Sequence, residues 1–126
     1  MTPGVTFDAG GLIALERGDR RVVALLAQSQ ERGAEVVVPA TALAQVVRSP
    51  VRQVRLMRLL RQPRTTTQPL DRADASFVGQ LLAATRTTDL TDAHVVICAT
   101  RSGYAVVTSD AGDLRRLAPG LDLIEV

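Results

Sequence analysis

The stretch DLTDAHVVICATRSGYAVVTSDAGD, residues 89–113, decides the fold of this chain. An unbroken apolar run predicts a helix over residues 93–100, and Asp92 stands where that helix would open. A four-residue β-prone segment over residues 105–108 then predicts a strand, and a second acid, Asp110, follows its carboxyl end. A helix that begins on an acid and a strand that leads to another acid indicate a functional edge of a sheet.

The N-terminal part of the chain repeats this arrangement. Residues 5–7 form a short apolar strand, and Asp8 follows it directly. In an open parallel sheet, the carboxyl ends of the strands and the N-termini of the following helices share one side of the molecule. We therefore expect Asp8, Asp92 and Asp110 to converge, although Asp8 and Asp110 are far apart in the sequence. Capping of the following helix is the alternative role for each of these acids.

The rest of the chain alternates short strands with helices. This alternation predicts an α/β fold, a three-layer α/β/α sandwich around a mostly parallel sheet of four to five strands, in a single domain over residues 1–126. The further strands are expected at residues 35–38, 67–70 and 121–126, and the further helices at residues 12–16, 20–32, 40–47, 50–61, 71–85 and 111–117.

Composition is that of an ordinary globular protein. The chain has 126 residues, of which 46% are hydrophobic and 22% charged, and no apolar stretch approaches a membrane span or a signal peptide. Its one cysteine fits a reducing compartment, so we expect a cytoplasmic protein. All 15 basic residues are arginine, which indicates either arginine-rich codon usage or recognition of phosphate groups. Scarce aromatic residues argue against a base-stacking platform.

Clustered carboxylates indicate a divalent metal. Carboxylate oxygens are the ligands that Mg²⁺ and Mn²⁺ prefer, and acids held close together repel one another unless a cation or a shared proton compensates. A metal-bound water would supply a nucleophile for cutting phosphodiester bonds. Asp8, Asp92 and Asp110 are the expected catalytic metal ligands, and Asp113 and Asp89 are further candidates.

Several motifs together resemble the PIN-domain family and, more narrowly, the VapC-type toxins of bacterial toxin–antitoxin systems. The resemblance runs nearly end to end, and it depends on the order of the motifs because each one alone is weak. The motifs are VTFD at residues 5–8, VVVP at 36–39 with ALA at 42–44, DAHVVICA at 92–99, VVTSD at 106–110, and DL at 113–114.

This resemblance implies a function and partners. It implies an Mg²⁺-dependent endoribonuclease, with Mn²⁺ able to substitute, that acts as the toxin of a type II toxin–antitoxin pair. It further implies RNA as substrate, a cognate antitoxin as partner, and a homodimer with no membrane association. Asp8, Asp92 and Asp110 match the acidic residues of the family.

One position departs from that pattern. Gln45 stands where the family has a glutamate, so the predicted site has one negative charge fewer. We expect weaker metal binding, with one ion or two, although the amide oxygen of Gln45 could still act as a ligand. The alternative function is a catalytically weakened PIN-like module that binds RNA or an antitoxin without cutting.

Other polar residues have less specific predictions. Thr108 and Ser109 could orient a water molecule or a phosphate oxygen beside Asp110. His94 and Cys98 are expected to pack in the core rather than to take part in catalysis. The arginines expected to contact RNA phosphate or the antitoxin are Arg17, Arg48, Arg52 and Arg55.

Two other classes of protein place acids at strand ends. A phospho-accepting receiver domain and a haloacid-dehalogenase-type phosphatase both also require a lysine near the phosphoryl group. The chain contains no lysine, and Gly10 stands where the phosphatase needs its second acid. Both classes are therefore excluded.

Overall fold

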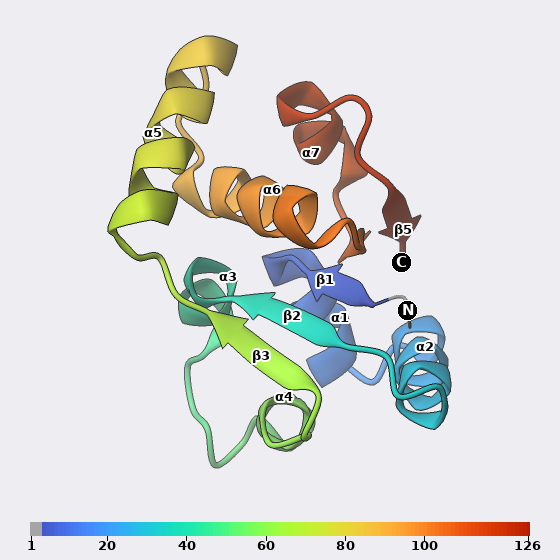
Figure 1. Ribbon diagram of the computed structural model, residues 1–126. Coiled ribbons are helices and arrows are strands. Elements are labelled where there is room, and N and C mark those ends of the chain that lie inside the picture. The colour runs from blue at the N-terminus through green and yellow to red at the C-terminus, as the bar shows by residue number, and fades with distance from the viewer. Residues whose placement is uncertain (1–3) are drawn as a thin grey trace.

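The computed structural model describes residues 4–126 and has a five-stranded, entirely parallel sheet at its centre (Figure 1). The strand order is β3-β2-β1-β4-β5, so the first strand along the chain is the middle strand of the sheet. The strands are β1 (Val5–Phe7), β2 (Val36–Pro39), β3 (Thr65–Gln68), β4 (Ala105–Thr108) and β5 (Leu123–Glu125).

Helices cover both faces of the sheet. α6 packs on β1, β2 and β4 and contacts α5 and α7, whereas α1 packs on β1 and β4 and contacts α2 and α4. α3 touches both α1 and α6 and so joins the two helical layers. The helices are α1 (Ala9–Glu16), α2 (Arg20–Glu31), α3 (Ala40–Val46), α4 (Val54–Leu60), α5 (Arg72–Thr85), α6 (Leu90–Ser102) and α7 (Ala111–Leu117).

The core forms because helices cover both faces of the largely apolar central strands. Phe7, Val38, Val106 and Val107 are fully buried, as expected of strands that are covered by helices on both sides. Leu12 of α1 and Val95 of α6 pack against them from opposite layers. The predicted three-layer α/β/α sandwich is confirmed, and the sheet is parallel throughout rather than mostly parallel.

The helix predicted over residues 50–61 starts later than expected. α4 begins at Val54, and residues 50–52 form a turn. The cause is Gln53, whose side chain accepts hydrogen bonds from the backbone N–H groups of Arg48 and Ser49 at 2.9 and 3.1 Å. The same side chain donates to the carbonyl of Val46, so the segment is fixed as a loop up to residue 53.

Other boundaries also differ from the prediction. α1 begins at Ala9 rather than at residue 12, because Asp8 caps it, and β5 spans Leu123–Glu125 rather than residues 121–126. β3 lies at residues 65–68 instead of 67–70, because Thr65 pairs with Val36 of β2 and starts the ladder earlier. α6 begins at Leu90, and its N-cap is Asp89 rather than Asp92, because the Asp89 carboxylate accepts the Asp92 backbone N–H at 2.9 Å. Asp92 therefore lies in the first turn of α6, and its carboxylate is not used as the cap.

Among the described residues, no helix is both long enough and apolar enough to cross a membrane.

Candidate functional site

Five carboxylates gather at the carboxyl edge of the sheet, and we call them the acidic cluster. Asp8 follows β1, Asp110 follows β4, and α6 and α7 contribute the others at their N-terminal ends. β1 and β4 are neighbours in the sheet, and this pairing brings together two acids from opposite ends of the chain. The acidic cluster consists of Asp8, Asp89, Asp92, Asp110 and Asp113.

Asp8 has two roles in this arrangement. Its carboxylate caps α1 by accepting the Gly11 backbone N–H at 2.7 Å, so the capping role is real. Asp8 is only 4% exposed, and this burial raises the pKa of its carboxyl group, with Asp110 adding to the effect. Hydrogen bonds from Thr108 and from the backbone act in the opposite direction. Asp8 is therefore held in place at the edge of the core.

Thr108 connects the two strand ends. Its side chain is fully buried and makes a hydrogen bond to Asp8. Its Oγ1 also accepts the backbone N–H of Asp110 at 2.9 Å. Thr108 thus positions both acids, whereas Ser109 is exposed beside it. The sequence prediction singled out both hydroxyls, and the structure gives this positioning contact to Thr108.

A glycine allows α1 to approach β4 this closely. A Cβ atom on Gly10 would collide with the side-chain oxygen of Ser109. The first turn of α1 can therefore lie against the end of β4 only without a side chain at this position. Asp8, one residue after the end of β1, is brought beside Asp110 as a result.

Asp92 is the acid most affected by its neighbours. Burial raises the pKa of Asp92 to about 6, and repulsion from Asp89, Asp8, Asp113 and Asp110 contributes further, in that order. All four other members of the acidic cluster thus lie close enough to act on this one carboxylate. The convergence that the sequence predicted is present in the structure.

A polar cavity of about 330 Å³ opens beside Asp92. Three carboxylates of the acidic cluster line it together with two arginines, the polar loop between α5 and α6, and one leucine. The lining residues are Arg86, Thr87, Thr88, Asp89, Asp92, Asp113, Arg116 and Leu117.

The donor set of the acidic cluster fits a hard divalent cation. All of its side-chain ligands are carboxylate oxygens, with the hydroxyls of Thr108 and Ser109 beside them, and no sulfur or imidazole is included. Burial and repulsion from the four neighbouring acids raise the pKa of Asp92 and so disfavour its charged form. A bound cation such as Mg²⁺ or Mn²⁺ would favour the charged form.

Gln45 is not drawn into this cavity. It lies on α3 with an exposed side chain, and it is absent from the residues that line the polar cavity. No hydrogen bond of its side chain is found within residues 4–126. Its predicted role as a metal ligand therefore has no contact in its favour.

Of the four predicted contact arginines, only Arg55 lies within a helix, α4. Arg17 follows the end of α1, and Arg48 and Arg52 lie in the loop between α3 and α4. Arg48 folds back on the end of α3 and donates to the carbonyl of Val47 at 2.7 Å, so its guanidinium is partly engaged. Arg55 donates to the carbonyl of Glu16 at 3.3 Å. Arg17 and Arg52 are exposed. None of the four lines the polar cavity beside the acidic cluster.

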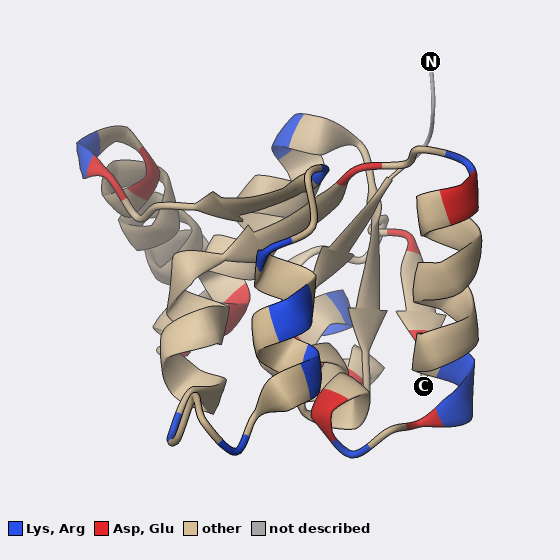
Figure 2. Cartoon of the chain, turned by 90° about the horizontal axis from the view of Figure 1, so that it is seen from below, with Lys and Arg blue, Asp and Glu red and all other residues tan. Residues whose placement is uncertain are grey.

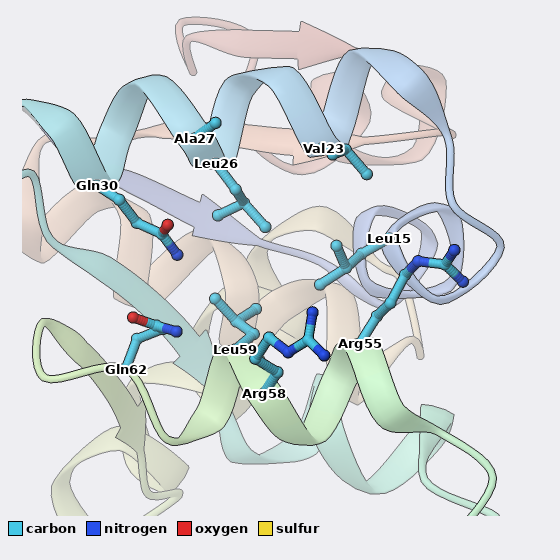
Figure 3. Close-up of a pocket in the computed structure, with 9 residues that line it drawn as sticks. All are labelled: Leu15, Val23, Leu26, Ala27, Gln30, Arg55, Arg58, Leu59 and Gln62. Atoms are coloured by element: carbon cyan, nitrogen blue, oxygen red, sulfur yellow. The ribbon is translucent and has the colours of Figure 1, made fainter.

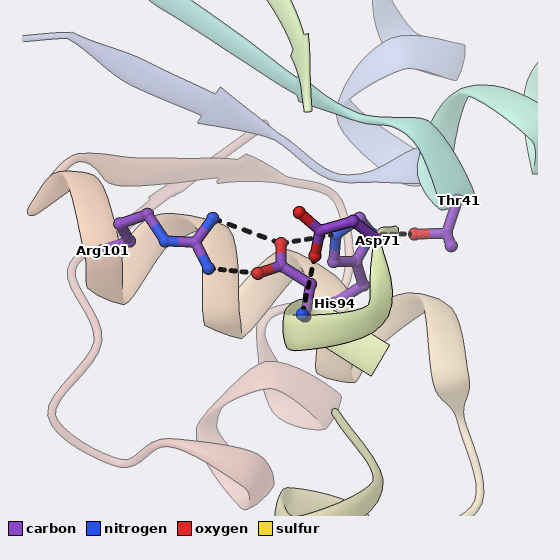
Figure 4. Close-up of polar contacts among 5 residues, drawn as sticks. Thr41, Asp71, His94 and Arg101 are labelled. Atoms are coloured by element: carbon purple, nitrogen blue, oxygen red, sulfur yellow. Dashed lines mark hydrogen bonds and ion pairs between the residues drawn. The ribbon is translucent and has the colours of Figure 1, made fainter. Parts of the chain in front are cut away.

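The sequence prediction missed a buried polar network between α3, α5 and α6 (Figure 4). Asp74 is 1% exposed and pairs with Arg101 through both carboxylate oxygens. His94 is fully buried, with its Nδ1 2.7 Å from the Thr41 hydroxyl and its Nε2 3.4 Å from Asp74. The available signal was the pair Asp74 and Arg101 on adjacent helices.

Cys98 lies close to Asp74 and His94, and their ligand atoms are within 4.8 Å of one another. Arg101 already neutralises Asp74 and holds the pKa of that carboxyl group below its usual range. Burial raises the pKa of the Cys98 thiol to about 12, so the thiol stays protonated. These features describe an internal ion pair in the core. The predicted packing roles of His94 and Cys98 are confirmed.

Charge is mixed over the surface of the molecule. In the view of Figure 2, basic and acidic segments both occur across the chain. The formal net charge is only +2. Attraction of a polyanion must therefore depend on local groups of arginines rather than on the overall field.

An apolar groove lies between α2 and α4 (Figure 3). Leu15, Leu26 and Leu59 point into it, and the guanidinium groups of Arg55 and Arg58 lie along one side. The groove has a volume of about 210 Å³ and shares no lining residue with the polar cavity. We call it the α2–α4 groove. It is a second, chemically different surface feature.

Comparisons with models of protein families and with curated proteins found no match. Solved structures with the same fold do exist. The chain is similar to a chain of VapBC2 from Rickettsia felis bound to a promoter DNA fragment, with 14% identity, a TM-score of 0.69, and coverage of 97% of this chain and 98% of that one.

Two further structures are similar. One is FitAcB from Neisseria gonorrhoeae, with 17% identity, a TM-score of 0.63 and 96% coverage of both chains. The other is FitAB bound to the IR36 DNA fragment, with 16% identity, a TM-score of 0.64, and coverage of 96% of this chain and 94% of that one. Because the sequence identities are this low, the structural similarity establishes a shared fold and nothing more.

These findings correct the family assignment. The sequence motifs identified the chain as a VapC-type toxin of the PIN-domain family, and this identification is wrong. No family model or curated protein supports it, and the similar structures are VapBC2 and FitAB assemblies, two of them bound to DNA, rather than an isolated toxin. Short motifs around strand ends predicted the fold correctly, but they do not identify a family.

Proposed function

We propose that this chain is an Mg²⁺- or Mn²⁺-dependent endoribonuclease that works within a toxin–antitoxin pair. The observation that carries the proposal is the acidic cluster. Five carboxylates gather at the carboxyl edge of a parallel sheet, and burial together with repulsion from the other four raises the pKa of Asp92 to about 6.

The chemistry follows from the residues present. A divalent ion bound at the acidic cluster would lower the pKa of a water molecule and neutralise charge on a phosphate oxygen. Asp8, Asp92 and Asp110 would hold the ion, with Asp89 and Asp113 beside them. Thr108 positions Asp8 and Asp110 through its hydrogen bonds to both. An ion would still have to draw the carboxylates together, because within residues 4–126 no three of the five lie within 4.8 Å of one another.

The choice of RNA as substrate rests on the same chemistry together with the proposed toxin–antitoxin role. The similar structures are named as VapBC2 and FitAB assemblies, which supports a place for this chain in such a pair. A site made of hard ligands suits hydrolysis of a phosphodiester.

The α2–α4 groove supports a protein partner. Its apolar floor and flanking guanidiniums of Arg55 and Arg58 suit an amphipathic segment that carries acidic residues beside apolar ones. We propose that the partner protein of the pair occupies this groove. Because the groove and the acidic cluster share no lining residue, the partner and the metal can bind at the same time.

A second candidate function is a module that binds RNA or a partner protein without cutting. It is favoured by Gln45, which brings no negative charge to α3 and has an exposed side chain. Such a module would keep the fold and the groove but would bind divalent ions weakly.

RNA cleavage by the purified protein tests the proposal. Total RNA is incubated with wild type, Asp8→Ala and Gln45→Glu, in Mg²⁺ or Mn²⁺ and in EDTA. Asp122→Asn is the matched control, because Asp122 is exposed and lies outside the acidic cluster. The nuclease predicts metal-dependent cutting by wild type and by Asp122→Asn that is lost in Asp8→Ala.

Two results would decide against it. If neither wild type nor Gln45→Glu cuts RNA or gains thermal stability with Mn²⁺, the nuclease proposal fails and the non-cutting module is favoured. If Asp8→Ala cuts as wild type does, the activity belongs to another part of the preparation.

A further inference from the structure

The polar cavity beside the acidic cluster has two walls of opposite charge. Asp89, Asp92 and Asp113 line it together with Arg86 and Arg116. The two arginines come from different elements: Arg86 follows α5, and Arg116 lies in the last turn of α7. The folded chain thus places two guanidinium groups, 30 positions apart in the sequence, at the edge of the cavity that the acids also line.

Neither guanidinium is engaged by the protein itself. Within residues 4–126, no carboxylate lies within 4.0 Å of Arg86 or Arg116, and neither side chain makes a hydrogen bond. Arg115, the neighbour of Arg116 on α7, does pair with Glu125 at 3.7 Å. Two cations that share a cavity with three acids and yet remain unpaired can accept an anion from outside.

The backbone at Arg86 provides an independent observation. Arg86 has φ +55 and ψ +43, and it is the only non-glycine residue with a positive φ among the described residues. α6 ends in the same conformation on Gly103, and both residues donate their backbone N–H to the carbonyl four positions earlier. Glycine adopts this conformation without a steric penalty, whereas arginine does not. An arginine at this position indicates a use for its side chain.

We propose that Arg86 and Arg116 form a subsite for a backbone phosphate of RNA, next to the phosphate that the acidic cluster would process. This proposal rests on the proposed nuclease function. The guanidinium fork matches phosphate oxygens, and it offsets the repulsion that the acids would exert on an incoming strand.

The lining of the cavity suggests which part of the RNA it contacts. The cavity, with a volume of about 330 Å³, leaves room for a phosphate with its hydration. No aromatic side chain lines it, so bases have no surface on which to stack. Thr87 and Thr88 add hydroxyl groups that can donate to phosphate oxygens. The subsite therefore recognises the strand and not its base sequence.

Binding measurements test this subsite separately from cleavage. The probe is a fluorescein-labelled, random-sequence 2′-O-methyl RNA, followed by anisotropy over a salt series in Mg²⁺, and its integrity is checked on a gel. The variants are Arg86→Gly and Arg116→Ala, and Arg115→Ala is the matched control on α7. Each subsite variant should weaken binding about tenfold, and the slope of log Kd against log salt should fall by about 0.7 per arginine.

Stability gives Arg86→Gly a second readout. A glycine relieves the strained backbone, so the urea midpoint of this variant should equal or exceed that of wild type while its RNA affinity falls. A residue with a purely structural role would lower both together.

The outcomes distinguish this inference from the nuclease proposal. Subsite variants that bind RNA as wild type does, with the same salt slope, overturn the subsite even if the protein cuts RNA. A wild type that binds no RNA also overturns it. Arginine-dependent binding without any metal-dependent cleavage supports the subsite and counts against the nuclease.

Discussion

The acidic cluster at the start of α6 and the single carboxylate of Asp74, on the adjacent α5, have opposite electrostatics. At the start of α6, burial and four neighbouring acids raise the pKa of Asp92 to about 6. Further along, Asp74 of α5 pairs with Arg101, and this hydrogen-bonded guanidinium lowers the pKa of Asp74 (Figure 4). Asp74 is the more deeply buried of the two residues, yet its pKa is lowered. Burial alone therefore does not decide the direction of the pKa shift.

The comparison separates a structural acid from a candidate ligand. Asp74 has a cation that the chain itself supplies, and its charge is compensated in the folded state. The acidic cluster has no such partner among the described residues, so its charge remains available to an external cation. Each prediction below tests this difference, and they run from the largest expected effect to the smallest.

The largest effect is expected on cleavage. Asp8→Asn and Asp92→Asn each remove a charged ligand of the acidic cluster, and RNA cleavage should fall on the order of 10³-fold. Asp74→Asn should retain cleavage at temperatures where it stays folded. Rates measured at saturating Mn²⁺ check this, and equal losses in Asp74→Asn and Asp92→Asn would show that the two groups do not differ in function.

For stability the ranking of the variants should be reversed, with the larger loss at Asp74 and not in the acidic cluster. Asp74→Ala leaves Arg101 and His94 without their partner, and it should lower the free energy of unfolding by about 2 kcal/mol, less than for a fully buried pair because the Arg101 side chain is 47% exposed. Urea unfolding measures this change. In the double variant Asp74→Ala/Arg101→Ala, part of the loss should be recovered, and strictly additive losses would argue against a coupled pair.

A pH dependence follows from the raised pKa of Asp92. Its value of about 6 in the folded state lies above the ordinary 3.8, so the stability that the protonated group contributes is fully present below about pH 4 and is lost as the pH rises through 6. At pH 7.5 the metal-free Asp92→Asn variant should therefore be more stable than wild type, on the order of 1 kcal/mol.

Bound metal should remove the difference in stability between wild type and Asp92→Asn. Mn²⁺ is expected to raise the thermal midpoint of wild type at pH 7.5 and to have little effect at pH 5, where Asp92 is mostly protonated. Thermal unfolding of wild type and Asp92→Asn at both pH values gives the four comparisons required. A gain with Mn²⁺ of the same size in Asp92→Asn would place the ion elsewhere.

The smallest effect is expected at Gln45. Because its side chain is exposed and lies outside the polar cavity, Gln45→Glu should tighten Mn²⁺ binding only about two- to threefold, through long-range attraction. Titration calorimetry measures it, with Gln28→Glu on α2 as control. A tenfold gain would show that α3 does deliver a ligand to the metal.

Local patterns were sufficient to predict much of the fold. Unbroken apolar runs such as residues 36–38 identify buried parallel strands. Asp8 and Asp110 could be placed at one edge because the carboxyl ends of parallel strands share one side of the sheet. The acidic cluster was predictable for the same reason. Its members follow strands or begin helices, and the local sequence pattern predicts these positions.

Features that depend on distant side chains were not predictable. Gln53 delays the start of α4 through hydrogen bonds to residues 46–49, and nothing in the helical periodicity reveals them. Arg101 reaches Asp74 across two helices. The left-handed conformation of Arg86 is equally hidden, because glycine is the usual signal for it. The family assignment failed because motif order around a sheet edge is shared by proteins with the same fold.

The strand order has a consequence for synthesis of the chain. β1 is made first but pairs with β4, which follows about a hundred residues later. Asp8 therefore meets Asp110 only when nearly the whole polypeptide has been translated, and contacts so distant along the sequence form late in folding. A nascent chain that has not yet released residues 105–110 from the ribosome therefore lacks an assembled acidic cluster.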